Sequence, residues 1–292
     1  MEPFTAPTTR QEIPRDWQGR PLVPQPTGGK PVGYTRCTTA VGLTEDTFIL
    51  SQWSQRMVAL GLARRPDLLA MVSATTDDNQ SLNRLVEEAK TAGGSEARAN
   101  LGTAIHAFTE MLDNGAILDA VPVAHQADVL AYLEATDQLE HEHVETFMVH
   151  DGYKVGGTPD RLTRLPDGRL VVFDLKTGGK PGQPLAGMAK IAQQLAFYSR
   201  MVLCDIETGE RTALDIDQAV GIVAHLPAGS GTCELIEVDL HAGWEGVELC
   251  QTIRDYRKRN RNLSQPFQMP EDPDAEPYDN SPDTIQEWLG LK

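Results

Sequence analysis

The chain has 292 residues, of which 40 % are hydrophobic, and its formal net charge at pH 7 is −16. This length and composition suit one large globular domain, or a core with additions. No apolar run approaches the roughly 18 residues that a membrane helix needs. The start of the chain, Met1–Thr5, has neither the basic nor the apolar segment of a secretory signal. We therefore expect a cytoplasmic protein without a membrane partner.

The net charge argues at first against a nucleic-acid partner, because a strongly negative protein repels phosphates. The distribution of the charges weakens that argument. Six acidic residues and no Lys or Arg lie between Pro270 and Gln286, in a Pro-rich stretch whose composition predicts disorder. Basic residues gather elsewhere, above all near the end of the last predicted helix: Arg254, Arg257, Lys258, Arg259 and Arg261.

Composition and apolar periodicity divide the chain into four parts. Residues 1–34 are rich in Pro, Gly and Thr and predict a mobile N-terminal arm. Residues 35–95 predict a helical N-terminal addition, residues 96–262 a folded core, and residues 263–292 an acidic Pro-rich tail.

The pattern of predicted elements defines the fold class. Helical spacing runs from about 45 to 113 and over 122–139. It is followed by strands over 144–150, 153–165 and 169–177, a helix over 185–204, strands over 219–226 and 233–240, and a helix over 243–259. This order predicts an α/β core with a helical N-terminal addition.

One pair of charged residues ends the most apolar predicted strand. Asp174 and Lys176 follow the run 170–173, which is too apolar to face water and is expected to be central in its sheet. Residues i and i+2 of a strand point to the same face, so the carboxylate and the ammonium emerge side by side. Taken alone, this arrangement is typical of a salt bridge at the end of a strand.

A second carboxylate precedes the turn that joins this strand to the one before it. If Pro166-Asp167-Gly168 makes that turn, Asp160 comes near Asp174 across the strand pair. Two close carboxylates repel each other unless a divalent cation holds them, and hard oxygen ligands suit Mg²⁺ or Mn²⁺ rather than Zn²⁺. Asp160 alone is also typical of an aspartate that caps a turn. Glu145, on the preceding strand, is a candidate third carboxylate, with an exposed strand acid as the alternative.

Two predicted helices carry further candidates. Gln194 and Tyr198 lie four residues apart and share a helix face with Lys190, and this stripe suits contact with a DNA backbone, with ordinary surface as the alternative. His106 lies upstream in an amphipathic helix. A lone helical histidine is more often a surface or core residue than a ligand.

Four motifs stand in order along the chain: Gly102-Thr103-x-x-His106, Gly157-x-x-Asp160, Asp174-x-Lys176 followed by Thr177-Gly178, and Gln194-x-x-x-Tyr198. In this order and spacing they resemble the RecB-type PD-(D/E)xK nucleases. That family includes nuclease domains of bacterial recombination helicase-nucleases, CRISPR-adaptation exonucleases and many phage recombination exonucleases. The resemblance covers about residues 100–200, and the implied fold extends to about residue 262.

The resemblance implies a restriction-endonuclease-like fold, a mixed central sheet flanked by helices, over residues 96–262. It implies a Mg²⁺ site in which Mn²⁺ substitutes, and Lys176 as the catalytic lysine. The implied metal ligands are Asp160, Asp174 and the Leu175 carbonyl, together with His106, for which a phosphate contact is the alternative. Glu145 is a less clear match to the first-motif acid. The implied DNA contacts are Gln194 and Tyr198, to which we add Lys180 and Lys190 as flanking basic residues.

The four cysteines invite a comparison with relatives that hold an iron–sulfur cluster through one early and three late cysteines. Here Cys37 is early, and Cys204, Cys233 and Cys250 are late. The late cysteines lack the tight spacing of such a cluster. We expect buried thiols rather than a cluster or disulfides.

The chain has no helicase signature such as a P-loop, so the resemblance favours a stand-alone phage recombination exonuclease acting on linear double-stranded DNA in the host cytoplasm. The N-terminal helices are expected to form the wall of a channel for DNA ends. Candidate phosphate contacts there are Arg36, Arg56, Arg64 and Arg65, with ordinary surface residues as the alternative. The acidic tail is expected to add solubility, to shield the groove, or to dock a partner such as a single-strand annealing protein. A structure-specific endonuclease and a non-catalytic DNA-binding recombination scaffold stay open as alternatives.

Overall fold

The computed structural model describes residues 12–75, 77–268, 283, 286–287 and 290, and of residues 96–99 only the backbone. Two compact units divide the chain, Met1–Arg254 and Asp255–Lys292. Residues 1–11 and most of the acidic stretch lie outside the described residues. The expectations of a mobile arm over residues 1–11 and of a disordered acidic tail therefore stay predictions. No helix in the described part of the chain is long and apolar enough to cross a membrane.

A five-stranded mixed sheet runs through the first unit, in the order β12-β11-β8-β7-β4. Its strands are β4 (Glu140–Val144), β7 (Arg161–Arg164), β8 (Leu170–Lys176), β11 (Val220–His225) and β12 (Glu234–Asp239). β8 is antiparallel to β7 and parallel to β11. Every residue of β8 before Lys176 is buried, which confirms the prediction of a central strand.

A second five-stranded sheet has the order β10-β9-β5-β6-β3. Its strands are β3 (Thr35–Arg36), β5 (Met148–His150), β6 (Val155–Gly157), β9 (Val202–Cys204) and β10 (Arg211–Thr212). A short hairpin of β1 (Leu22–Val23) and β2 (Val32–Gly33) precedes it.

The expectation of a mobile arm is wrong for residues 12–34. Val23 and Tyr34 are buried in one apolar cluster with Phe147 and Val149 of the second sheet. These few apolar side chains hold a Pro- and Gly-rich stretch in place, and composition does not reveal their partners.

The segment that contains β4 and β5 passes from the first sheet to the second. Val144 pairs with Arg161 in the first sheet, and Met148 pairs with Gly157 in the second, which continues the same antiparallel register. The predicted single strand over 144–150 is therefore interrupted, because its first residue belongs to one sheet and its last three to the other. Residues 145–147 and 158–160 form the crossing between the two sheets.

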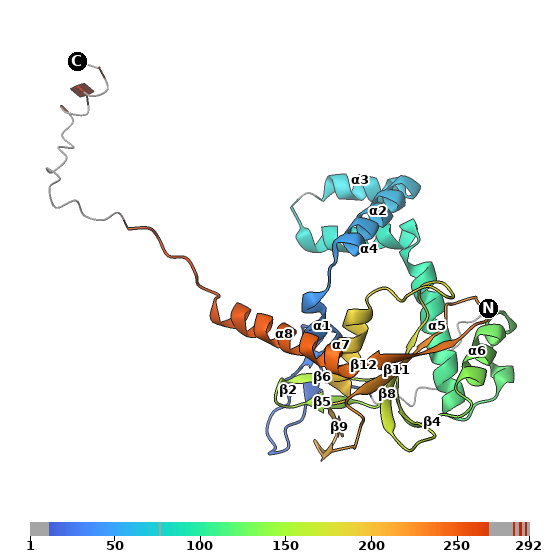
Figure 1. Cartoon of the computed structure of the whole chain (residues 1–292). Coiled ribbons are helices and arrows are strands. Elements are labelled where there is room, and N and C mark those ends of the chain that lie inside the picture. Colours follow the sequence, from blue (N-terminus) through green and yellow to red (C-terminus); the bar gives the residue numbers. More distant parts are fainter. Residues whose placement is uncertain (1–11, 76, 269–282, 284–285, 288–289, 291–292) are drawn as a thin grey trace. The chain divides into compact units, whose positions relative to one another are not determined.

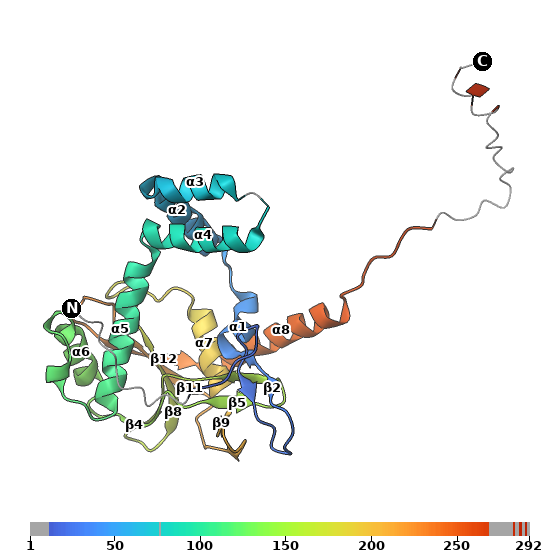
Figure 2. The same ribbon diagram turned by 180° about the vertical axis from the view of Figure 1, so that it is seen from behind.

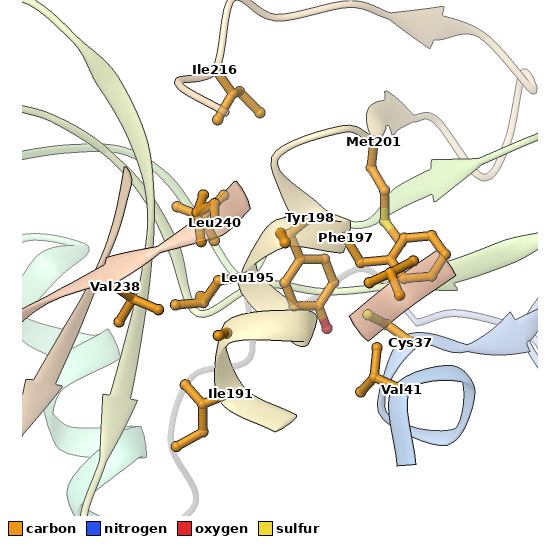
Figure 3. Packing of buried hydrophobic residues seen from close by; sticks show 14 of the residues in the cluster. Cys37, Val41, Ile191, Leu195, Phe197, Tyr198, Met201, Ile216, Val238 and Leu240 are labelled. Atoms are coloured by element: carbon orange, nitrogen blue, oxygen red, sulfur yellow. The ribbon is translucent and has the colours of Figure 1, made fainter. Parts of the chain in front are cut away.

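Helices cover both faces of the first sheet (Figures 1 and 2). On one face lie α5 (Ser95–Asp113) and α6 (Val123–Ala135), and on the other lie α7 (Met188–Tyr198), α1 (Cys37–Val41) and the start of α8 (Leu240–Arg259). Figure 3 shows Leu195 of α7 packed near Val238 and Leu240. Side chains alternate between the two faces of β8, which explains why helices pack on both. Phe173 and Leu175 face α5 and α6, while Val172 faces α7. The predicted α/β fold is confirmed.

Three further helices form the N-terminal addition: α2 (Phe48–Arg64), α3 (Pro66–Ala74) and α4 (Asn79–Gly93). The backbones of α2 and α4 touch at two glycines. A Cβ at Gly61 would lie 1.7 Å from the carbonyl oxygen of Ala89, and one at Gly93 would lie 2.1 Å from that of Met57. α1 does not belong to this group, since Cys37 and Val41 lie in the core with α7.

Two of the arginines expected to contact phosphates are used inside the addition. Arg64 donates to the carbonyl oxygens of Ala92 and Gly93, at 3.0 and 3.1 Å, and so caps the end of α4. Arg65 forms an ion pair with Asp67. Both side chains thus have partners within the addition, and phosphate contact by them stays a prediction.

The predicted helix over 185–204 is too long at its C-terminal end. α7 ends at Tyr198, and Val202–Cys204 forms β9, which pairs with β5. Pairing with a strand more than 50 residues earlier in the chain overrides the local helical pattern.

Candidate active site

The hairpin of β7 and β8 brings the two predicted aspartates together. The turn is closed by two backbone hydrogen bonds, Leu165 N–H to Arg169 O and Gly168 N–H to Leu165 O, both 2.9 Å. Arg161 pairs with Phe173, so the same register places Asp160 opposite Asp174. The Leu175 N–H donates to Oδ2 of Asp160 at 2.8 Å, which fixes the Asp160 carboxylate against β8.

Asp174 is a buried carboxylate with an incompletely satisfied oxygen. Its side chain is 5 % exposed, and the Lys176 ammonium lies in contact with Oδ2. Apart from this contact, Oδ2 accepts no hydrogen bond from the described part of the chain. Burial, followed by the negative charge of Asp160, raises the pKa of Asp174 to about 7, and Lys176 opposes this rise.

Asp160 links the two sides of the site. His106 on α5 places Nδ1 3.5 Å from Asp160 Oδ2. Of the motif residues, the structure thus brings His106, Asp160, Asp174 and Lys176 to one end of β8.

Glu145 lies at the crossing between the sheets rather than within a strand, which corrects the sequence analysis. The register of β4 with β7 places it opposite Asp160, and its N–H donates to the Asp160 carbonyl at 3.0 Å. Its φ of 50° is a left-handed conformation that non-glycine residues seldom adopt. Glu145 also lines a cavity of about 600 Å³ together with Arg15 and Thr158. Glu145, Asp160 and Asp174 therefore stand side by side on three adjoining strand paths.

The residues predicted to form a DNA-binding stripe on α7 differ in their exposure. Tyr198 is 3 % exposed. Its hydroxyl packs against Gly157 so closely that a Cβ on that glycine would lie 2.8 Å from the hydroxyl oxygen. Figure 3 shows its ring among the core residues, near Cys37. Lys190 donates to Glu45 at 2.6 Å. Tyr198 is thus buried and Lys190 is held in an ion pair, whereas Gln194 is partly exposed and Lys180 is exposed. DNA contact by these four residues stays a prediction.

A family model described as the PD-(D/E)XK nuclease superfamily matches residues 80–225, which is half of the chain. The chain belongs to this superfamily. A solved structure, the crystal structure of SSO0001, is similar at 13 % identity and a TM-score of 0.28, covering 70 % of this chain and 86 % of the other. No curated protein matches the chain.

Membership makes this chain a PD-(D/E)XK nuclease, and the superfamily implies a DNA substrate and typically uses divalent metals such as Mg²⁺. The donors present fit such a metal. Asp160 and Asp174 supply hard oxygen atoms, and a cation between them would offset the repulsion that Asp160 exerts on the buried Asp174 carboxylate. Within the described residues no three His, Cys, Asp or Glu side chains form a ready-made metal cluster.

The PD-(D/E)XK core contains two positioning features that the sequence analysis missed. His225 pairs in register with Lys176, is 2 % exposed, and its Nε2 lies 2.9 Å from the carbonyl oxygen of Gly178. Gly102 of α5 faces Thr177, whose Oγ1 lies 2.6 Å from the position of a Cβ on that glycine. Both features hold the chain that follows Lys176. No local pattern marks His225, whereas the glycine of the Gly102-Thr103-x-x-His106 motif was a visible signal of close approach.

The cysteines of this nuclease lie apart. Cys37 belongs to the cluster around α7, Cys204 to the cluster around Tyr34, and Cys233 packs at the edge of the cluster that holds Phe173. Cys250 is buried and its thiol lies 3.5 Å from the carbonyl oxygen of Val41. Burial raises the pKa of Cys233 to about 11. Cys37, Cys204 and Cys250 are thus buried free thiols, as expected, whereas Cys233 is only partly buried.

Proposed function

We propose that this chain is a metal-dependent DNA exonuclease of the RecB type, which hydrolyses phosphodiester bonds of linear double-stranded DNA. The observation that supports it best is the placement of Asp160 opposite Asp174, with Lys176 beside them at the end of a buried strand. An ion pair alone needs one carboxylate. Two carboxylates that lie close together, one of them buried and with a raised pKa, suit a cation between them.

In this proposal Asp160, Asp174 and the Leu175 carbonyl hold Mg²⁺ or Mn²⁺, with His106 and Glu145 as further ligands. The bound metal supplies an activated water at neutral pH and neutralises charge on the scissile phosphate. The Leu175 N–H keeps the Asp160 carboxylate oriented toward β8. Because Asp174 is buried, its carboxylate is held rigidly and without competing water.

Lys176 has a separate role. Its ammonium contacts Asp174 and its side chain is 30 % exposed, so it can reach a substrate while it stays paired. We assign it to orienting the nucleophilic water and to stabilising the negative charge that develops on the phosphate. His225 holds the backbone after Lys176, and Lys180 and Gln194 are the proposed DNA contacts.

The preference for an exonuclease, and a role in phage recombination, rest on the order of the motifs. The test is digestion of the same DNA as a linear duplex and as a covalently closed circle, in Mg²⁺ and in EDTA. An exonuclease degrades the linear form in Mg²⁺ and leaves the circle intact. Cutting of the circle would make the enzyme an endonuclease. DNA binding with no cleavage in Mg²⁺ or Mn²⁺ would make it a binding scaffold and overturn the proposal. Labelling the 5′ or the 3′ end reports the polarity.

A further inference from the structure

A buried ion pair joins α5 to β7 next to the candidate active site. Asp113, the last residue of α5, accepts from Nε of Arg161 at 2.8 Å, and Nη2 of Arg161 lies 2.7 Å from the same Oδ2. Nη2 also donates to Oγ1 of Thr109 at 2.9 Å. The side chains of Arg161 and Asp113 are 1 % and 5 % exposed. The guanidinium therefore has its partners on one helix face.

Three more side chains extend this pair into a polar network. The Tyr132 hydroxyl donates to Asp113 at 2.9 Å and lies 2.9 Å from Nε2 of His141, whose Nδ1 lies 2.8 Å from Oγ1 of Thr163. Burial lowers the pKa of His141, so the ring is neutral. Donor and acceptor roles then match throughout: the ring donates from Nε2 to Tyr132 and accepts at Nδ1 from Thr163.

Each partner of the ion pair is connected to a residue of the candidate active site, Arg161 to Asp160 and Asp113 to His106. Arg161 follows Asp160 in the chain. On α5, His106, Thr109 and Asp113 are spaced by three and four residues, so they share one face. The contact between His106 and Asp160, 3.5 Å from Nδ1 to Oδ2, thus continues the line of contacts that α5 makes with β7.

A buried charge pair tolerates few geometries. Removing one partner leaves an uncompensated charge in a low dielectric, while a shift of the helix breaks several charge-assisted hydrogen bonds at once. An apolar contact would instead allow α5 to slide along the sheet. The network therefore fixes both the distance and the axial position of α5 relative to β7.

We propose that the Asp113–Arg161 pair, with Thr109, is a positioning device that holds His106 against Asp160. This inference rests on the proposed function, in which both residues serve the metal site. Thr109, Asp113 and Arg161 do not touch the reacting atoms, and in this proposal they act by fixing α5, and with it His106, against Asp160.

The test is a double-mutant cycle between Asp113→Asn and His106→Ala, measured on linear DNA in Mn²⁺. Asp113→Asn alone should lower kcat by about 10–100-fold, the range for residues that orient ligands, with little change of KM. In the His106→Ala background it should lower kcat by less than about threefold. Equal losses in both backgrounds would show that the pair does not act through His106. Thr109→Val, which removes one hydrogen bond and conserves volume, should show the same dependence with a smaller loss and serves if Asp113→Asn folds poorly.

A matched control uses Arg164, which lies on β7 with Arg161 and pairs with Glu142 of β4. Glu142→Gln breaks the more exposed ion pair of Glu142 with Arg164 and should leave kcat unchanged in both backgrounds. Crystal structures of the metal-free wild type and Asp113→Asn give a readout that does not depend on cleavage. The His106–Asp160 separation should lengthen by about 1 Å or more, and an unchanged separation contradicts the inference. If the wild type cleaves no DNA, the proposed function fails, and this structural comparison still decides the positioning role.

Discussion

At the scale of single residues, the site depends on how far each carboxylate is withdrawn from water. Asp174 is buried within β8 of the β7–β8 hairpin. Asp160 lies at the crossing between the two sheets, where the backbone N–H of Leu175 holds its carboxylate. Strand periodicity and a strong turn signal are local, so the sequence predicts that these two residues and Lys176 meet. The partner of Lys190 is Glu45, 145 residues earlier, and the space that Tyr198 fills depends on Gly157. No local pattern contains that information.

The burial of Asp174 predicts how the stability of the metal-free protein depends on pH. The pKa of Asp174 is about 7 in the folded state, against an ordinary value of 3.8. Between these two pH values the folded state therefore binds more protons than the unfolded state. Stability therefore falls as pH rises from about 4 to about 7 and is constant above. Asp174→Asn removes this loss, worth on the order of 4 kcal/mol at most.

Urea unfolding in EDTA measures this effect. The variant should be more stable than the wild type at pH 8, and the difference should shrink to a small value at pH 4.5. A gain of the same size at both pH values would show that the carboxylate is not the cause.

At the scale of elements, α5 approaches the end of β8 closely because Gly102 has no side chain. A Cβ on Gly102 would lie 2.6 Å from Oγ1 of Thr177 but 3.7 Å from its Cβ. Gly102→Ala should therefore displace the chain after Lys176 and lower activity about tenfold or more, although alanine favours the helix by about 1 kcal/mol. Adding Thr177→Ala removes the clashing oxygen and should restore most of the activity. If the double variant stays as impaired as Gly102→Ala, the clash is not the reason.

The elements themselves were largely predictable, and their partners were not. The helices over 45–113 and the strands around Asp174 follow from apolar periodicity and turn residues. The break between β4 and β5 was not visible, because Val144 to His150 is apolar enough for one strand and only the pairing with β6 and β7 divides it. The packing of the N-terminal stretch could not be predicted for the same reason. Val23 and Tyr34 pack against side chains of the second sheet that lie more than 100 residues later in the chain.

At the scale of the whole molecule, a net charge of −16 opposes the approach of DNA. Six of the acidic charges lie in residues 271–283. A variant that ends at Leu263 should therefore associate with linear DNA faster at low ionic strength. The difference should vanish in about 0.5 M salt, where charges more than a few ångströms apart are screened. Stopped-flow association rates test this, and equal rates at low salt would show that the tail does not act through charge.

The most direct test of the nuclease site is digestion of an end-labelled linear duplex in Mg²⁺ by the wild type and three variants. Asp174→Asn and Lys176→Ala remove the proposed metal ligand and catalytic lysine, and Asp167→Asn changes an exposed carboxylate in the turn of the same hairpin. We predict that the first two variants lose at least about 100-fold in rate while they keep a folded circular dichroism spectrum, and that Asp167→Asn digests DNA like the wild type. Full activity of either Asp174→Asn or Lys176→Ala would contradict the assignment of this site.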